Sequence, residues 1–326
     1  LTPVKNEAWI LERFLKLASL WADHIIIADQ LSTDNSREIA RKFEKVMLVE
    51  NSSKVFNEPE RQQLLLTEAR RFEGPKLIFT LDADECLTPN FSSSPEWDTM
   101  LNSAPGTIFQ FQLFNLQPGM KTMWADLHTY PLAYMDDGAK HAGPQFNSFR
   151  VPLPPANTTV FLNEISIMHF SDTDWERYIS KNRWYNCYDK IINPQRSSID
   201  LFRQYNQRFF YAKERFELIP KSWIEDYSHL GIDMTSVQSI PKRIWDVQIL
   251  DLFDQYGTNF FKKERIWNVD WQKIAILNER PDPGKYRDPR NKVYKKIQTY
   301  LLLTQPIHQK FYIRFIDKLI RILLKY

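Results

Sequence analysis

Residues 77–85 read Leu-Ile-Phe-Thr-Leu-Asp-Ala-Asp-Glu, and this stretch decides the fold. Residues 77–81 form a short, uncharged and mostly aliphatic run, which is typical of a strand buried on both faces, as in parallel sheets covered by helices. Two Asp residues at positions i and i+2 directly after such a strand can aim both carboxylates at one divalent cation. Asp-x-Asp alone is equally common in solvated turns, so its position after a buried strand carries the prediction of a cation site.

The same pattern repeats towards the N-terminus. Apolar runs at residues 24–28 and 46–49 predict two more buried strands, the first of which ends at Asp29. Between the strands, amphipathic helices are predicted at residues 7–21, 35–43 and from Pro59 onwards. Alternating strands and helices predict an α/β fold with a mostly parallel sheet flanked by helices. Ligands of such sheets bind beyond the carboxyl ends of the strands.

Polar clusters follow three of the expected strand ends. They are Lys5-Asn6-Glu7, Asp29 and Asp82-Ala83-Asp84. Each cluster alone could be an ordinary polar turn. Because all three follow strand ends, we expect them to meet at one edge of the sheet and to form a ligand site there.

Composition narrows the function classes. Among 326 residues the net charge is only +3, so a nucleic-acid partner is not expected. Cys86 and Cys187 are two isolated thiols, which indicates neither a disulfide framework nor a zinc motif and favours a reducing, cytoplasmic location. No apolar run approaches the length needed to span a bilayer.

The second half of the chain has a different character. Residues 107–116 alternate apolar and polar side chains, which predicts a half-exposed strand, and residues 117–168 are expected to form loops and short strands. From about residue 172 the sequence is helical and rich in aromatic residues. Residues 309–325 predict a basic amphipathic helix. Two interpretations of this helix stay open: it packs on its own domain, or it makes a peripheral contact with the inner face of an anionic membrane.

Three motifs in order support a family resemblance. The set Pro-Val-Lys-Asn-Glu (residues 3–7), Asp-x-x-Ser-Thr-Asp (29–34) and Leu-Asp-Ala-Asp-Glu (81–85) resembles the family-2 glycosyltransferases of the GT-A fold. The similarity is to the branch whose metal motif reads Leu-Asp-Ala-Asp-Glu. It implies a Rossmann-like catalytic domain over residues 1–190 that binds a nucleotide sugar. Residues 191–326 are then expected to form a mainly helical C-terminal region that ends in the basic amphipathic helix.

The resemblance also implies an activity and its partners. The expected reaction is an inverting, metal-dependent transfer of a sugar from a nucleotide-sugar donor, with UDP as the expected nucleotide. The acceptor would be a glycan or a lipid-linked molecule. The implied cofactor is Mn²⁺ or Mg²⁺, which neutralises the diphosphate before it leaves.

The resemblance assigns roles to individual residues. Pro3 and Glu7 would border the nucleotide pocket, and Asp29 would hydrogen-bond the base. The other implied contacts are Asp82 with the ribose or the metal, Asp84 with the metal, His169 as a further metal ligand, and Arg61 near the donor. Arg61 is equally well read as a helix charge paired with Glu58 or Glu60. His169 is also read as a strand-end histidine whose ring nitrogens bond the backbone.

The catalytic base is the least defined assignment. An inverting transfer needs a group that accepts the proton of the acceptor hydroxyl. Asp137 is the first choice and Asp136 the second, although both also fit a turn before Gly138. Relatives carry His-Glu shortly before an arginine like Arg150, whereas residues 146–150 read Phe-Asn-Ser-Phe-Arg and contain no acid.

Two other functions stay open. A chain of the same fold without its base would be a catalytically impaired module that binds nucleotide sugars. A nucleotidyltransferase also uses paired Asp and a metal, but it would usually carry a Gly-rich phosphate loop near its first strand. The sequence has no glycine before Gly74, which argues against that class.

Overall fold

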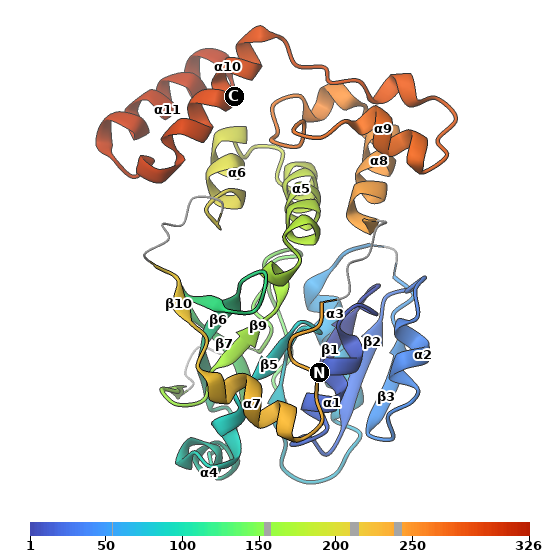
Figure 1. Cartoon of the computed structure of the whole chain (residues 1–326), viewed down its shortest axis with the longest axis vertical. Coiled ribbons are helices and arrows are strands. Elements are labelled where there is room, and N and C mark those ends of the chain that lie inside the picture. The colour runs from blue at the N-terminus through green and yellow to red at the C-terminus, as the bar shows by residue number, and fades with distance from the viewer. Residues whose placement is uncertain (54, 153–157, 209–214, 238–242) are drawn as a thin grey trace. The chain divides into compact units, whose positions relative to one another are not determined.

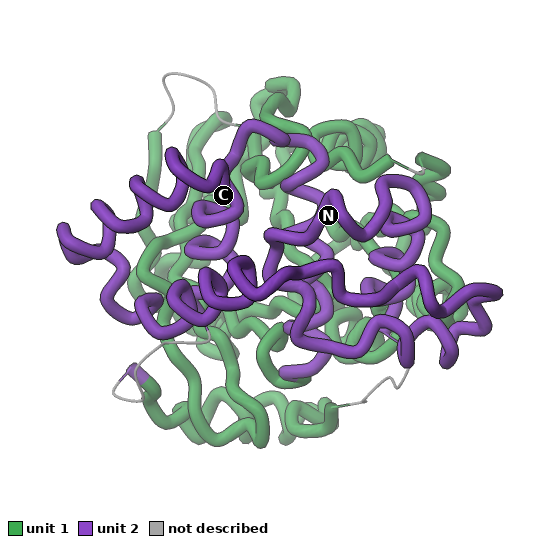
Figure 2. Tube along the Cα trace, turned by 90° about the horizontal axis from the view of Figure 1, so that it is seen from above, with its two compact units in different colours: residues 1–174, 216–240 green, residues 175–215, 241–326 purple. Residues whose placement is uncertain are grey.

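The computed structural model describes residues 1–53, 55–152, 158–208, 215–237 and 243–326. The chain divides into two compact units, coloured separately in Figure 2. Unit 1 contains residues 1–174 and 216–240, and unit 2 contains residues 175–215 and 241–326. Each unit is described by itself.

Unit 1 begins with a small parallel sheet. Its strands are β1 (Thr2–Val4), β2 (Ile25–Asp29) and β3 (Val46–Glu50), in the order β1-β2-β3. Both neighbouring pairs are parallel, with Val4 opposite Asp29 and Asp29 opposite Glu50. The predicted α/β fold with a parallel sheet is confirmed, and Figure 1 shows these strands among the first helices.

Alternation along β2 explains why its first four residues are all apolar. Ile25 and Ile27 belong to the core that also contains residues of α1 (Leu11–Ala18). Ile26 and Ala28 point to the other face and pack with Leu65 and Leu66 of α3 (Glu58–Ala69). Because both faces of the strand are covered, every residue of β2 is buried. The short helix α2 (Ser36–Ala40) connects β2 to β3.

The second sheet of unit 1 is mainly antiparallel. Its path is β10-β7-β6-β9-β5, with β4 paired to β7 and β8 paired to β6. Its strands are β4 (Leu77–Phe79), β5 (Glu85–Leu87), β6 (Ile108–Leu116), β7 (Thr122–Met135), β8 (Thr159–Phe161), β9 (Ile167–His169) and β10 (Glu217–Leu218). The predicted strand at 107–116 is β6. The sheet is less parallel than expected, because the β6–β7 hairpin adds an antiparallel pair at its centre.

The long strand β7 corrects the expectation of loops at residues 117–168. The strand contains Pro131, and proline is unusual inside a strand because it has no N–H for the ladder. The register slips at this point: Phe109 pairs with Ala133, and Gln110 pairs with Pro131. This irregularity passes over Leu132 and lets the strand continue through the proline. The turn of the hairpin holds Gly119 and Met120 at positive φ, at 82° and 54°.

Short helices complete unit 1. They are the 3-10 helix η1 (Pro89–Ser92), α4 (Pro95–Leu101), η2 (Ser171–Thr173) and α7 (Lys221–His229). The segment 216–240 is fastened to the first part of the chain. Tyr227 donates its hydroxyl hydrogen bond to Leu87 O at 2.9 Å, and Arg13 Nε donates to Asp233 O at 2.8 Å.

Unit 2 is helical in the parts of the chain that the structure describes. Its helices are α5 (Trp175–Ile192), α6 (Ser198–Tyr205), α8 (Ile244–Tyr256), η5 (Thr258–Phe261), α9 (Trp271–Leu277), η6 (Pro283–Tyr286), α10 (Lys292–Thr304), η7 (Gln305–Ile307) and α11 (Phe311–Leu324). Two buried ion pairs join helices distant in sequence. Arg183 pairs with Asp246 at 2.8 Å, and Arg203 pairs with Asp317 at 3.1 Å.

The division of the chain differs from the expected boundary at residue 190 in two ways. The first segment of unit 1 ends at Asp174, so the aromatic helix α5 belongs to the helical unit 2. Residues 216–240 then return to unit 1, where β10 extends the second sheet beside β7. Local composition could not show this return, because the pairing partner of β10 lies almost a hundred residues earlier.

Candidate active site

Three segments meet at the carboxyl ends of the first strands. Lys5-Asn6-Glu7 follows β1, and the β2 strand ends on Asp29, which pairs with Val4. The loop after β3 is held to this edge by Gln30, whose Nε2 donates to Ser53 O at 3.1 Å. That loop leads into α3, where the charges of Asp82 and Arg150 act on the carboxyl of Glu58. The structure therefore gathers the predicted polar clusters at one end of the strands.

Asn6 interlocks the first two motifs. It lies at φ 56°, and its side-chain oxygen accepts a hydrogen bond from Thr33 N at 2.7 Å. Its own N–H donates to Ser32 Oγ at 2.9 Å, and Glu7 N donates to Ser36 Oγ at 2.9 Å. The Lys-Asn-Glu and Asp-x-x-Ser-Thr-Asp motifs thus hold each other in place. Asparagine suits this position, because it tolerates a left-handed backbone better than most residues.

Asp29 has a buried acceptor that the protein does not use. Its side chain is 1% exposed, and its Oδ2 accepts hydrogen bonds from Arg37 Nε at 2.6 Å and Ser32 N at 3.2 Å. Its Oδ1 is buried and has no hydrogen-bond partner among the described residues. A buried acceptor is costly when unpaired. A ligand N–H, such as that of a nucleobase, would satisfy it.

Glu7 and Pro3 lie on either side of the end of β1. Glu7 Oε2 accepts the indole N–H of Trp9 at 2.6 Å, so its orientation is set by the start of α1. Pro3 is the middle residue of β1 and pairs with Ala28, two residues before the loop. It lies inside the strand and not in the loop that follows.

Asp82 is ion-paired. Its Oδ2 lies 2.9 Å from Arg150 Nη2, and its own N–H donates to Glu85 Oε2 at 2.9 Å. Glu85, whose side chain is only 1% exposed, also accepts a hydrogen bond from Arg150 Nη2 at 3.0 Å. Burial alone would lower the pKa of Arg150, but the charges of Asp82 and Glu85 outweigh it and raise this pKa above its ordinary value.

Asp84 lies beside His169. Asp84 is 4% exposed, and its Oδ1 is 3.7 Å from His169 Nε2, which is too long for a hydrogen bond. The strands β5 and β9 bring the two together, since Glu85 pairs with His169 and Phe170 N donates to Asp84 O at 2.8 Å. The predicted proximity of Asp84 and His169 is therefore present in the structure.

A second contact orients the His169 ring. Its Nδ1 lies 2.9 Å from Asn115 Oδ1, which is an acceptor. A neutral ring that donates from Nδ1 to this oxygen has its lone pair on Nε2, the nitrogen nearer to Asp84. Histidine ligands of metals are commonly oriented in this way by an acceptor on the other ring nitrogen.

The predicted set of three metal ligands is only partly assembled. Asp84 and His169 face each other, whereas Asp82 is bound by Arg150. Within the described ranges no group of three or more His, Cys, Asp and Glu side chains has metal-binding geometry. Mg²⁺ and Mn²⁺ sites in nucleotide enzymes often use only one or two protein ligands together with phosphate oxygens. The Asp84–His169 pair therefore fits a cation that is completed by its substrate.

Arg61 lies in the first turn of α3. Its guanidinium stacks over the ring of Phe56, 5.3 Å from the ring centre. Its Nε is buried and makes no hydrogen bond within the described parts of the chain. Burial raises the pKa of the nearby Glu58 carboxyl, while the Ser148 N–H and the charge of Arg61 lower it. The structure thus places an unused, buried hydrogen-bonding N–H of Arg61 close to Glu58, and the predicted contact of Arg61 with the nucleotide sugar stays a prediction.

The segment 136–150, here called the strap, runs along α3 and brings Arg150 to the acidic motif. It is fastened at the end of the helix by Arg70, in the middle by Gln63, which accepts from His141 N at 3.1 Å, and at the start by Glu58. Arg150 and Glu85 both belong to sequence motifs, but these motifs predicted no role for either residue. The spacing of 65 residues between them gave no signal of their contact.

The strap overturns the assignment of the catalytic base. Asp136 N donates to Lys76 O at 2.8 Å, directly before β4, whereas Asp82 follows the other end of that strand. Lys76 and Asp82 are six positions apart along the segment that contains β4, which is about 20 Å at the usual strand rise. Asp136 is moreover bound by Arg70 at 2.7 Å, and its hydrogen bonds outweigh burial and lower its pKa. Asp137 is exposed and caps the Ala139 N–H at 3.0 Å. Neither residue lies at the Asp82 edge.

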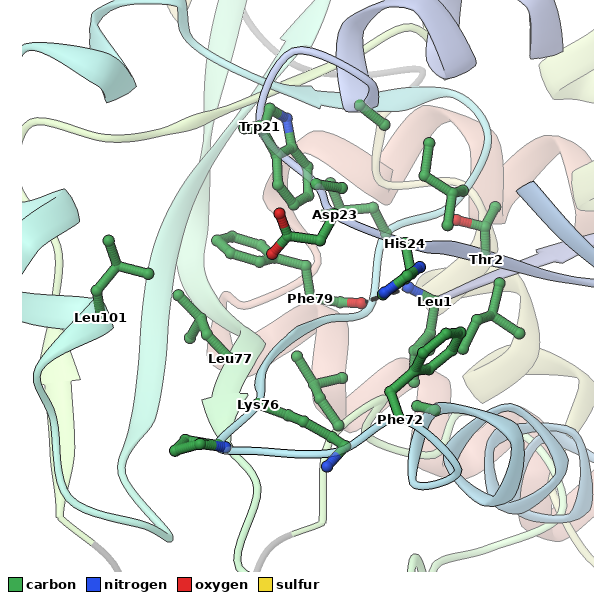
Figure 3. A pocket seen from close by; sticks show the side chains of 18 of the residues that line it. Leu1, Thr2, Trp21, Asp23, His24, Phe72, Lys76, Leu77, Phe79 and Leu101 are labelled. Atoms are coloured by element: carbon green, nitrogen blue, oxygen red, sulfur yellow. Dashed lines mark hydrogen bonds between the residues drawn. The ribbon is translucent and has the colours of Figure 1, made fainter. Parts of the chain in front are cut away.

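A cavity of about 390 Å³ lies at the opposite, amino end of the strands (Figure 3). It is lined by the first residues of β1, β2 and β4 and by aromatic side chains such as Trp21 and Phe79. Leu1 N donates a hydrogen bond to Phe79 O there at 2.7 Å. The cavity is separate from the candidate active site.

Comparison with known proteins identifies the class. Residues 1–108 match the model of the glycosyl transferase family 2. This segment contains the three motifs and the Asp29 and Asp84 positions. Residues 1–108 therefore belong to that family, and the predicted family is confirmed there. The protein is a glycosyltransferase, as predicted. Among curated proteins, no relative matches the chain.

Solved structures add a distant likeness. TarS of S. aureus, residues 1–349, is 12% identical, with 92% of this chain and 90% of that chain covered and a TM-score of 0.32. The longer TarS structure is covered over 54% of its length, with 12% identity, 95% coverage of this chain and a TM-score of 0.32. The TarS 1–349 complex with UDP gives 12% identity, 92% and 90% coverage and a TM-score of 0.30. At these values no residue role or activity is transferred from them.

Proposed function

We propose that this glycosyltransferase uses a nucleotide-sugar donor, with UDP as the nucleotide, and that its reaction is metal-dependent and inverting. The observation that carries the proposal is the unused, buried Oδ1 of Asp29 at the strand edge. The uracil ring of UDP has an N–H that can donate to such an acceptor. A buried site built to receive a hydrogen bond discriminates strongly against ligands that cannot supply one.

The diphosphate would lie between this acceptor and the acidic motif. Arg61 offers a buried, unused Nε, and Arg150 presents its guanidinium beside Asp82. Guanidinium groups suit phosphate oxygens, because they offer several donors in a planar fork. These two side chains would hold the donor before transfer and retain the nucleoside diphosphate afterwards.

Asp84 and His169 are the residues proposed to hold Mn²⁺ or Mg²⁺. Their facing Oδ1 and Nε2 atoms and the Asn115 contact fit a cation that also binds phosphate oxygens. When bound, the cation would supply positive charge that stabilises the departing diphosphate. Asp82 is not proposed as a metal ligand in this arrangement, because Arg150 already neutralises it. A ribose contact remains open to its second carboxylate oxygen.

A second candidate function follows from the positions of Asp136 and Asp137, the two residues expected to act as the catalytic base. Inverting transfer needs a proton acceptor near the acceptor hydroxyl, and Asp136 and Asp137 lie at the other end of β4. A chain that binds donor without turning it over is therefore the alternative. The family match favours glycosyl over nucleotidyl transfer. The acceptor is proposed to be a glycan or a lipid-linked molecule.

One experiment tests the proposal in two stages. A thermal-shift screen compares UDP-, GDP- and ADP-sugars, each with Mn²⁺ and with a chelator, because a ligand that binds only the folded state raises the melting temperature. We expect the largest increase with a UDP-sugar and Mn²⁺. The active donor is then incubated with enzyme, and UDP release is measured. Binding without UDP release would support the binding module, and equal shifts with all donors would contradict UDP as the specific nucleotide.

A further inference from the structure

The C-terminal helix pair carries a concentration of positive charge. Residues 292–326 contain eight Lys and Arg residues and one Asp, a net charge of +7. The whole chain has +3, so the other 291 residues are net acidic at −4. Such segregation of charge is a local property of α10 and α11 and favours an anionic partner for them.

One face of α11 fixes its orientation within unit 2. Ile313 and Asp317 are 4% and 3% exposed, and Asp317 binds Arg203 Nη2 at 3.1 Å and the Tyr300 hydroxyl at 3.0 Å. Separating a buried, hydrogen-bonded ion pair is costly. The helix therefore cannot rotate to bury its other face against α10 (Figure 1).

The remaining face of α11 is apolar and exposed. Phe311, Phe315 and Ile322 are 84%, 54% and 62% exposed, and Leu323 beside them is 73% exposed. At 100° per residue, the first three fall within one narrow sector of the helix. Scattered apolar residues are normal on a surface, whereas a continuous apolar face of this kind marks an interaction site.

A basic row borders the apolar face. Lys310, Arg314 and Lys318 are exposed, and none of them forms an ion pair in the part of the chain that the structure describes. On the helical wheel Lys318 and Arg314 lie about 20° and 60° from Phe311, at the edge of the apolar face, and Lys310 directly precedes the helix. Apolar side chains flanked by unpaired cations are the combination found in helices that lie flat in the headgroup region of anionic membranes.

We infer that α11 docks on an anionic lipid surface, with its axis parallel to the membrane. A second copy of this chain fits poorly, because it would bring a +7 segment against an identical one. In the described ranges no helix is long and apolar enough to cross a bilayer. With 14 residues, α11 is about 21 Å long, shorter than the ~30 Å hydrocarbon core. The docking is independent of the proposed donor and reaction.

Vesicle co-sedimentation of the full chain tests the docking. We expect binding to phosphatidylcholine vesicles that contain phosphatidylglycerol, weaker binding in high salt, and little binding to pure phosphatidylcholine. The substitutions Lys310→Gln, Arg314→Gln and Lys318→Gln together should weaken binding roughly a hundredfold. The apolar triple variant Phe311→Ser, Phe315→Ser and Ile322→Ser should weaken it at least tenfold.

Helix α9 of the same unit offers a matched control. Lys273, Ile276 and Leu277 are also exposed, so Lys273→Gln, Ile276→Ser and Leu277→Ser together remove one positive charge and two exposed apolar side chains from another helix. This control variant should bind vesicles like the unmodified chain. Equal binding by the apolar α11 variant, or equal loss in the control, would overturn the inference. So would a dimer in sedimentation velocity that the α11 substitutions dissociate while vesicle binding is absent.

Fluorescence labelling gives a second readout. Cys86 and Cys187 are both buried, and burial raises the pKa of both thiols, which leaves them unreactive. A dye sensitive to polarity can therefore be attached selectively to Phe315→Cys and, as a control, to Leu277→Cys. We expect a blue shift with anionic vesicles only at position 315. A shift at neither position would contradict insertion of α11.

Discussion

The two ends of the candidate active site are built in different ways. The end around Asp29, which is proposed to bind the nucleoside, is here called the nucleoside end. There, Asn6, Ser32 and Ser36 link motifs that lie fewer than thirty residues apart. At the end proposed to bind the diphosphate, here called the diphosphate end, Glu85 binds Arg150, and Asp84 lies beside His169. These contacts span 65 and 85 residues. The first end is determined largely by local sequence, and the second by the tertiary course of the strap and of β9.

This difference has an energetic consequence. The acidic motif places Asp82, Asp84 and Glu85 close together, and Glu85 is almost fully buried. Without Arg150 their charges would be uncompensated. The stability of the diphosphate end therefore depends on the guanidinium of Arg150, which is distant in the sequence. The nucleoside end depends on several hydrogen bonds between residues that are closer in the sequence.

The largest expected effect follows from replacing Arg150. Arg150→Met leaves the buried Glu85 carboxylate without its ion-pair partner, and breaking a buried pair costs about 3 kcal/mol or more. We expect urea unfolding to show a loss of this size. Arg71→Met, which breaks an ion pair whose arginine is 68% exposed, should cost less than about 1 kcal/mol.

A double variant separates charge from shape in this prediction. Arg150→Met combined with Glu85→Gln removes the uncompensated charge and should regain part of the lost stability. Equal stability losses in the single and double variants would show that packing of the strap, and not the ion pair, stabilises this end.

The next effect concerns the metal. Asp84→Ala should lower metal-dependent UDP release by at least about a hundredfold, because a principal cation ligand is lost. Asp98→Ala, an exposed acid on α4, is the control and should retain full activity. Activity of Asp84→Ala that still responds to Mn²⁺ would place the cation elsewhere.

A smaller effect is expected at the nucleoside end. Asp29→Asn replaces a charged acceptor and should weaken UDP binding about tenfold in calorimetry, the size of one lost hydrogen bond to a charged group. The response to Mn²⁺ should persist, since Asp84 and His169 are unchanged. Arg37→Gln removes the same ion pair but keeps the acceptor, so it should leave the preference for UDP intact.

The smallest effect is expected at Asp137, which the structure places away from the Asp82 edge. Asp137 is exposed and lies with Asp136 at the amino end of β4. We therefore expect Asp137→Asn to leave the turnover rate unchanged and to alter the free energy of unfolding by no more than about 0.5 kcal/mol. Steady-state kinetics and urea unfolding measure both. A loss of turnover with donor binding retained would return Asp137 to the role of proton acceptor.

The sequence alone determined the features that depend on local patterns. The apolar run at Ile25–Ala28 predicted a strand covered on both faces, and the polar clusters after β1, β2 and β4 predicted a shared edge. The amphipathic pattern of α11 predicted its two-sided character. Such features follow from side-chain periodicity and turn chemistry, which act over a few residues.

Only the tertiary structure decided the contacts between distant segments. It placed Asp136 at the wrong end of β4 for a base, brought Arg150 to Glu85, and continued β7 through Pro131. It also returned residues 216–240 to unit 1. Each outcome depends on which strand or helix lies alongside, and that choice is made by burial and pairing across the whole unit. Local sequence therefore carries no signal of it.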